Sequence, residues 1–259
     1  MANRISKARP LVIANWKMYI ETPEAARAFV ASLKRRAASF APAEAWVAAP
    51  FTLLPLLKGI KLGGQTVSAH EGPHTGEVSA MMLREAGASF VLVGHSERRR
   101  QVIEGKEVEG ESNEDVHAQL AAAANAALTP VLCVGERERS PEGTHFNFIE
   151  EQLASALRGA QSLASKLVVA YEPVWAIGKT AVDAMRPQEV EETVIFIRKV
   201  LASVLGREPA RKIKVLYGGS VEPDNAQSLL AEGGVDGFLV GHASAKIDSF
   251  VVILKACKR

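Results

Sequence analysis

Four side chains could together remove a proton from a carbon next to a carbonyl. Glu172 follows the apolar run Leu167–Tyr171 and is a candidate base. His95 is a candidate proton donor, Lys17 supplies a fixed positive charge, and Asn15 supplies an amide donor. In such a reaction the base takes the C–H proton while the imidazole and the ammonium stabilise the oxygen that becomes negative.

Two glycine-rich segments offer backbone N–H groups for an anion. They are Gly218–Ser220 and the segment that begins at Gly241. Together with the four side chains they suit a small phosphorylated sugar as the substrate. Each feature also has a purely structural interpretation: a buried histidine, a surface lysine, a turn, or a surface acid beside a loop. The chemical interpretation therefore depends on a fold that brings all of them to one place.

Short apolar segments recur about every thirty residues and are expected to form strands. Their apolarity is continuous rather than alternating, which indicates strands that are covered on both faces. The eight expected strands are Leu11–Asn15, Ala45–Ala49, Thr66–Ala69, Phe90–Val93, Val131–Val134, Leu167–Tyr171, Ile213–Leu216 and Gly237–Val240.

Helical patterns lie between these segments. The clearest begins at Pro187, repeats apolar residues every three or four positions, and ends at Gly206. Another begins at Ser112, with Asp115 three residues later as a partial capping box. Pro223 is expected to begin a further helix. Strands that alternate with helices in this way predict an α/β fold, a single (β/α)₈ barrel over residues 1–259.

The barrel fold explains why the candidate residues would meet. Catalytic groups of such barrels lie at the carboxyl ends of the strands. Asn15 and Lys17 follow the first expected strand, His95 the fourth, Glu136 the fifth and Glu172 the sixth. An open doubly wound sheet is the structural alternative, but no G-x-G-x-x-G sequence follows any strand.

Composition excludes several classes of protein. The 259-residue chain is 47% hydrophobic with a formal net charge of +2, which argues against binding to nucleic acid or membranes. Cys133 and Cys257 have no metal-ligand spacing, so we expect neither a metal site nor a disulfide. The amino-terminal segment has no apolar core of a signal peptide, and a cytoplasmic protein is expected.

Seven motifs, in one fixed order, make the chain resemble the triosephosphate isomerase family, whose fold is the TIM barrel. NWKM and AYEPVWAIG contain three of the four candidate catalytic residues, and VGHSERR contains the fourth. The seven segments are Asn15–Met18, Thr75–Ser79, Val93–Arg99, Thr129–Glu136, Ala170–Gly178, Tyr217–Val221 and Gly237–Gly241.

The resemblance assigns roles to the catalytic residues. It implies that Glu172 moves a proton between adjacent carbons and that His95 moves protons between the two oxygens. Lys17 would stabilise the developing charge, with Asn15 polarising the substrate beside it. The implied reaction interconverts dihydroxyacetone phosphate and D-glyceraldehyde 3-phosphate through an enediol(ate), in glycolysis and gluconeogenesis. It requires no metal and no organic cofactor.

Further residues are implied to support this reaction. Ser96 resembles the resting partner of the base, and Glu97 the acid that holds the lysine. The phosphate would be bound by backbone N–H groups of Gly178, Ser220, Gly241 and His242.

The segment Glu172–Thr180 resembles a lid that closes over the phosphate. In the family Trp175 swings during closure and Glu136 is its resting partner. Ile177 and Leu239 would then clamp over the base and exclude water.

This lid is two residues shorter than the family pattern AIGTGKTA, because the chain reads AIGKTA. We therefore expect that Gly178 still meets the phosphate, while the clasp formed by Tyr217 and Ser220 is rearranged.

Three other departures concern His242, Tyr19 and Gly64–Thr66. His242 stands where the family has glycine, so its side chain either adds attraction to the phosphate or only faces solvent. Tyr19 stands where the family has asparagine. The segment around Thr75 resembles a loop that inserts into a neighbouring subunit, which implies a homodimer.

Three alternative functions remain open at this point. One is isomerisation of four-carbon keto-sugar phosphates of the erythrulose phosphate type. A second uses Lys17 as a Schiff-base nucleophile in an aldolase-like lyase. The third is a catalytically inactive barrel that serves as a binding module.

Overall fold

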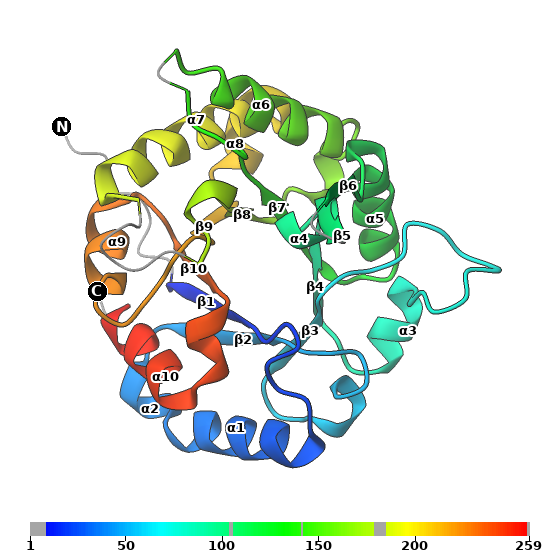
Figure 1. The fold of residues 1–259 in the computed structure, drawn as a ribbon, viewed down its shortest axis with the longest axis vertical. Coiled ribbons are helices and arrows are strands. Elements are labelled where there is room, and N and C mark those ends of the chain that lie inside the picture. Colours follow the sequence, from blue (N-terminus) through cyan, green and yellow to red (C-terminus); the bar gives the residue numbers. More distant parts are fainter. Residues whose placement is uncertain (1–8, 104–105, 141, 179–184, 258–259) are drawn as a thin grey trace.

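The computed structural model describes residues 9–103, 106–140, 142–178 and 185–257. Its centre is a closed barrel of eight parallel strands in the order β1-β10-β9-β8-β7-β4-β3-β2 (Figure 1). The expected (β/α)₈ fold is therefore confirmed. The barrel strands are β1 (Leu11–Asn15), β2 (Glu44–Ala48), β3 (Lys61–Gly64), β4 (Phe90–Val93), β7 (Thr129–Val134), β8 (Val168–Tyr171), β9 (Lys214–Tyr217) and β10 (Gly237–Val240).

Helices surround the barrel on its outside (Figure 1). The α-helices are α1 (Pro23–Arg35), α2 (Ala37–Phe40), α3 (Ala80–Glu85), α4 (Ser96–Arg99), α5 (Asn113–Asn125), α6 (His145–Ala156), α7 (Pro187–Leu205), α8 (Arg207–Ala210), α9 (Ala226–Glu232) and α10 (Ile247–Ala256). Short 3₁₀ helices are η1 (Leu54–Leu56), η2 (Gln161–Leu163), η3 (Val174–Ala176) and η4 (His242–Ala245).

Alternate residues of every barrel strand except β3 belong to two separate apolar clusters. Leu11 and Ile13 of β1 pack inside the barrel, whereas Val12 and Ala14 pack outward in the cluster that the helices cover. Fully burying one such aliphatic side chain contributes about 1.5–3 kcal/mol. Both faces of a strand are thus shielded from water, which is why the strand sequences are continuously apolar.

The third strand was placed wrongly by the sequence pattern. It was expected at Thr66–Ala69, but β3 is Lys61–Gly64. Its two glycines, which resemble a turn signal, are required by close packing. A Cβ on Gly63 would lie 2.5 Å from the Phe90 ring, and one on Gly64 would lie 2.9 Å from Leu83. The large side chains of neighbouring elements occupy the space that strand side chains normally fill.

The helix ends agree with most of the sequence signals. Helix α7 begins at Pro187 and ends before Gly206, as expected. Ser112 and Asp115 form a full capping box at α5. The helix expected from Pro223 begins only at Ala226. The Asn225 side chain accepts from the Glu222 N–H and donates to the Ser220 carbonyl, and these bonds shape a turn before the helix.

Two features lie outside the barrel. The antiparallel strands β5 (Arg100–Ile103) and β6 (Lys106–Glu109) form a hairpin after α4, which the sequence pattern did not predict. The loop between β3 and α3 extends away from the body (Figure 1), and residues 70–77 are exposed. Within the described ranges, no helix is both long and apolar enough to cross a membrane.

Candidate active site

The predicted catalytic residues line one cavity at the carboxyl ends of the strands. Its volume is about 170 Å³. Asn15 ends β1, and His95 and Glu172 follow β4 and β8. Residues after β9 and β10 complete the wall. The predicted site residues among those that line the cavity are Asn15, Lys17, His95, Glu172, Ile177, Gly178, Ser220, Leu239, Gly241 and His242.

The candidate base is almost completely buried, and two neighbours hold its carboxylate. Glu172 is 2% exposed. Its Oε2 accepts a hydrogen bond of 2.9 Å from the Ser96 backbone N–H, and its Oε1 lies 3.2 Å from His95 Nε2. Ser96 thus meets the base through its backbone, because its hydroxyl makes no hydrogen bond within the described part of the chain.

The backbone fixes the tautomer of His95. Its Nδ1 accepts from the Glu97 backbone N–H at 3.2 Å, at the start of α4. A ring nitrogen that accepts carries no proton, so we infer a neutral imidazole whose proton is on Nε2. Nε2 is the atom that faces Glu172 and also lies 3.3 Å from Asn15 Nδ2. With its proton on Nε2 the ring donates to Glu172 and does not accept from Asn15, so Nε2 and Asn15 Nδ2 are two neighbouring N–H donors at the cavity wall.

Lys17 adopts an unusual backbone conformation. Its φ is +46°, a region that costs a non-glycine residue about 1–3 kcal/mol. The Asn15 side chain accepts from the Lys17 N–H at 3.2 Å. The Lys17 Nζ pairs with Glu97 Oε1 at 2.5 Å, and the Lys17 Cε would lie 3.6 Å from a Cβ placed on Gly241. The strained turn aims the ammonium into the cavity instead of out to solvent.

Gln65 is a positioning residue that the sequence reasoning missed. Its Nε2 donates to the Lys17 carbonyl at 2.9 Å and to the Ala48 carbonyl at 3.3 Å. Gln65 directly follows β3, so the rule that selected the other strand-end residues would have selected it too. It was missed because the third strand was expected at Thr66–Ala69.

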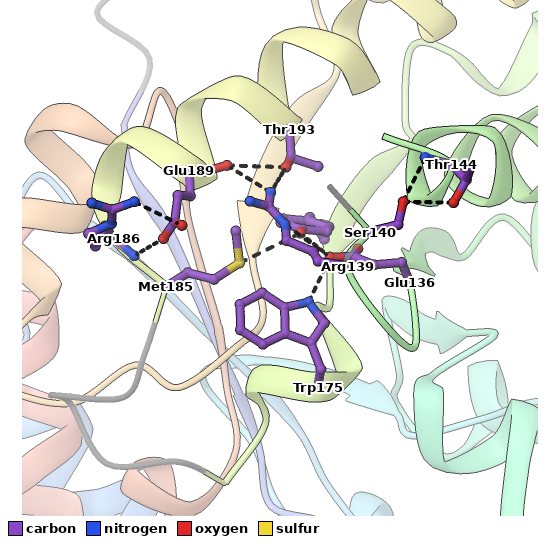
Figure 2. A network of polar contacts seen from close by, with 10 residues as sticks. Glu136, Arg139, Ser140, Thr144, Trp175, Met185, Arg186, Glu189 and Thr193 are labelled. Atoms are coloured by element: carbon purple, nitrogen blue, oxygen red, sulfur yellow. Dashed lines mark hydrogen bonds and ion pairs between the residues drawn. The ribbon is translucent and has the colours of Figure 1, made fainter. Parts of the chain in front are cut away.

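The first half of the expected lid is hydrogen-bonded to the segment that follows β7. Trp175 Nε1 donates to Glu136 Oε1 at 2.8 Å, and the same oxygen accepts from the Tyr171 hydroxyl at 2.9 Å (Figure 2). Glu136 is 1% exposed. This is the contact expected of a resting lid. Of the expected lid segment, Lys179 and Thr180 lie outside the described residues.

Arg139 joins this contact to helix α7. Its guanidinium lies 3.6 Å from Glu136 Oε1 and donates to the Thr193 hydroxyl at 2.7 Å. It also lies 5.9 Å from the centre of the Trp175 ring. Beyond the lid, Arg186 and Glu189 cap α7. The hydrogen bond between their side chains lowers the pKa of Glu189. The lid base is thus anchored to a long, well-packed helix.

At the glycine-rich end, Ser220 contacts the lid. Its hydroxyl donates to the Ala176 carbonyl at 2.8 Å. The Tyr217 ring is buried, and its hydroxyl would lie 2.3 Å from a Cβ on Gly219, so only glycine fits there. Burial and the nearby Glu136 carboxylate raise the pKa of Tyr217. Within the described residues, the Tyr217 hydroxyl makes no hydrogen bond to the lid.

A second cavity, of about 250 Å³, lies on the other side of Glu172. Ser96, Arg99 and Cys133 are in its wall, but Lys17 and His95 are not. Burial and the Glu172 carboxylate raise the pKa of the Cys133 thiol well above its usual value. The chemistry therefore belongs to the smaller cavity, where base, imidazole and ammonium meet.

This arrangement can move protons without a metal. A carboxylate can take a proton from carbon while a neutral imidazole and an ammonium act on oxygen. Within the described ranges, no group of three or more His, Cys, Asp or Glu side chains is placed to hold a metal ion.

Comparison with known proteins gives one consistent result. A family model described as triosephosphate isomerase matches residues 10–257. The triosephosphate isomerase of Citrifermentans bemidjiense is 40% identical over 258 residues, with 95% of this chain and 98% of that protein covered. That of Thermus thermophilus is 41% identical over 256 residues, with 95% and 98% covered. The crystal structure of triosephosphate isomerase from Bartonella henselae superposes with a TM-score of 0.81 at 38% identity, covering 97% of this chain and 100% of that one.

Proposed function

The chain belongs to the triosephosphate isomerase family and is an isomerase of triose phosphates, and we propose that Glu172, His95, Lys17 and Asn15 carry its reaction. The enzyme interconverts dihydroxyacetone phosphate and D-glyceraldehyde 3-phosphate by proton transfer. One observation supports the assignment above all others: a buried carboxylate, a neutral imidazole and an ammonium line the same small cavity beside two glycine-rich turns.

The proposed steps balance every proton. Glu172 takes a proton from C1 of dihydroxyacetone phosphate, and the carbonyl electrons move to the oxygen on C2. His95 Nε2 gives its proton to that oxygen and then takes the proton of the hydroxyl on C1. Glu172 returns the first proton to C2, and the C1 oxygen becomes the aldehyde. The 3.2 Å separation of Glu172 from His95 supports these steps, because both groups can then reach one three-carbon substrate.

Lys17 and Asn15 stabilise the charge that forms on oxygen. Both line the cavity, and the Asn15 side chain fixes the turn that carries Lys17. Fixed donors of this kind need no reorganisation when the charge appears, which makes them effective in a site that excludes water. The ion pair between Lys17 and Glu97 requires the ammonium form of the lysine, whereas a Schiff-base lyase needs the lysine as a free amine.

For the phosphate we propose the backbone N–H groups of Gly178, Ser220, Gly241 and His242. All four residues line the cavity at its glycine-rich end. Closure of the lid would break the Trp175–Glu136 bond. Ile177 and Leu239 would then cover Glu172, and water would leave the site.

We also propose a single folded domain that assembles as a homodimer in the cytoplasm. The exposed loop at residues 70–77 supports dimerisation, as do the large apolar side chains of Met18, Met81 and Met82, which are 81%, 56% and 61% exposed. The free thiols of Cys133 and Cys257 fit a reducing compartment. Sedimentation equilibrium tests the assembly, and a monomer at micromolar concentration would contradict it.

A coupled assay tests the function directly. Purified protein is given D-glyceraldehyde 3-phosphate, and the dihydroxyacetone phosphate formed is reduced by a dehydrogenase that consumes NADH. Turnover without added metal, in the presence of a chelator, is the expected result. The four-carbon alternative is tested in parallel, and kcat/KM is expected to be higher for the three-carbon substrate. Absence of turnover on the three-carbon substrate would contradict the proposal.

A further inference from the structure

Two aromatic side chains form a pair at the phosphate end of the cavity. Tyr19 follows β1 and His242 follows β10, which is paired with β1 in the barrel. Their ring centres are 5.4 Å apart and the ring planes meet at 79°. Both residues line the substrate cavity, and both side chains are exposed at its mouth. A T-shaped contact of this kind brings the edge of one ring to the face of the other.

Charged side chains surround this pair in the cavity wall and in the neighbouring groove. Lys17 lines the same cavity but pairs with Glu97. Glu222 also lines the cavity, from the segment after β9. On the other side of Tyr19 lies a groove of about 730 Å³. The charged residues in the wall of that groove are Glu21, Lys246 and Asp248.

His242 has no carboxylate within 4.0 Å among the described ion pairs. Its ring is therefore available to an anion that enters the cavity. Imidazole is also the side chain whose charge ordinarily changes between pH 5 and 8. Among the other titratable groups of the cavity wall, Glu172 and His95 contact each other at 3.2 Å.

From this placement we propose that the His242 side chain, backed by the Tyr19 ring, is a second cation for the substrate's phosphate. The inference rests on the proposed function and deepens it, because a side chain is added to the backbone donors of the phosphate site. A protonated imidazole attracts the dianion, and the Tyr19 ring, 5.4 Å away, holds it at the cavity wall.

Two consequences follow. The affinity of the cavity for a dianion rises as the pH falls through the range in which imidazole gains its proton. The effect falls on KM rather than kcat, because the phosphate keeps its charge during isomerisation and is bound equally in the ground and transition states. An exposed ion pair contributes little, so the expected change in affinity is about two- to fivefold.

Sulfate is the probe, because it remains a dianion across this pH range whereas phosphate does not. Its binding is measured at pH 6 and pH 8 as competitive inhibition and, separately, by direct NMR titration of the amide signals. The comparison uses the unchanged protein, His242→Asn, and the control His117→Asn. His117 lies on α5, outside the cavity wall.

The unchanged protein and His117→Asn are expected to bind sulfate about two- to fivefold more tightly at pH 6 than at pH 8. This ratio is expected to fall close to one in His242→Asn. In isomerisation assays the same substitution is expected to raise the KM for the triose phosphate rather than to lower kcat. An equal ratio in all three proteins would overturn the proposal.

Tyr19 is tested by Tyr19→Phe, which keeps the ring, and Tyr19→Leu, which removes it. The first is expected to retain the sulfate ratio and the second to reduce it; an unreduced ratio in Tyr19→Leu would refute the role of the ring. Failure of the proposed function is distinguishable, since it appears as absence of triose phosphate turnover in the unchanged protein. The NMR titration reports on His242 in either case.

Discussion

Gln65→Ala tests whether Lys17, the proposed catalytic lysine, is held in place by a side chain outside the cavity wall. The substitution removes two hydrogen bonds, of 2.9 Å to the Lys17 carbonyl and 3.3 Å to the Ala48 carbonyl. At about 0.5–1.5 kcal/mol each, they contribute about 1–3 kcal/mol. The left-handed conformation of Lys17, with φ of +46°, costs about the same amount. Without Gln65 the strained turn therefore loses the interaction that balances its cost.

The expected loss of activity follows from the fraction of molecules in which Lys17 keeps its strained turn. A loss of about 1–3 kcal/mol reduces kcat/KM by about 5- to 150-fold, since 1.36 kcal/mol is a factor of ten. The assay is steady-state isomerisation, with unfolding in urea measured in parallel. The matched control is Thr66→Val, which removes the neighbouring hydroxyl bonded to Glu111 at 3.3 Å and leaves Lys17 untouched. Equal rates for Gln65→Ala and Thr66→Val would refute the reasoning.

Three further predictions concern the base, the barrel interior and the buried thiol. Glu172→Asp draws the carboxylate back by about 1 Å and should lower kcat about 10²-fold in steady-state assays; an unchanged rate would count against this base. Gly63→Ala places a Cβ 2.5 Å from the Phe90 ring and should reduce the free energy of unfolding by about 1–3 kcal/mol, measured in urea; a wild-type midpoint would contradict the close packing of β3. Burial raises the pKa of Cys133, so its thiol stays protonated and should react with iodoacetamide at pH 8 far more slowly in folded than in unfolded protein; equal rates, followed by mass spectrometry, would show an accessible thiolate.

Strand-end positions were predictable where strands have apolar side chains. Leu11–Asn15 and Phe90–Val93 were placed at the bounds that β1 and β4 have. β3 was not, because Gly63 and Gly64 carry no side chain, and the groups that fill their place belong to Phe90 and Leu83. The sequence of one segment does not show which side chains from a distant segment pack against it. Because the third strand was misplaced, Gln65 was not recognised as a strand-end residue.

The site itself was predicted in part. The strand-end rule selected Asn15, Lys17, His95 and Glu172, which share one cavity. The part played by Arg139 in anchoring the lid was not foreseen. Its partners Thr193 and Glu136 are far from one another in the sequence and meet only because α7 packs beside the lid base.

A crystal structure with glycerol 3-phosphate tests the central claim most directly, because this three-carbon phosphate lacks the carbonyl and cannot react. His95 Nε2 and Lys17 Nζ are predicted to lie about 3 Å from its hydroxyl oxygens. The Glu172 carboxylate should lie about 3–3.5 Å from C1 or C2, with the phosphate at the glycine-rich turns. A ligand bound in the cavity behind Glu172, or one that meets none of the three side chains, would contradict the shared site.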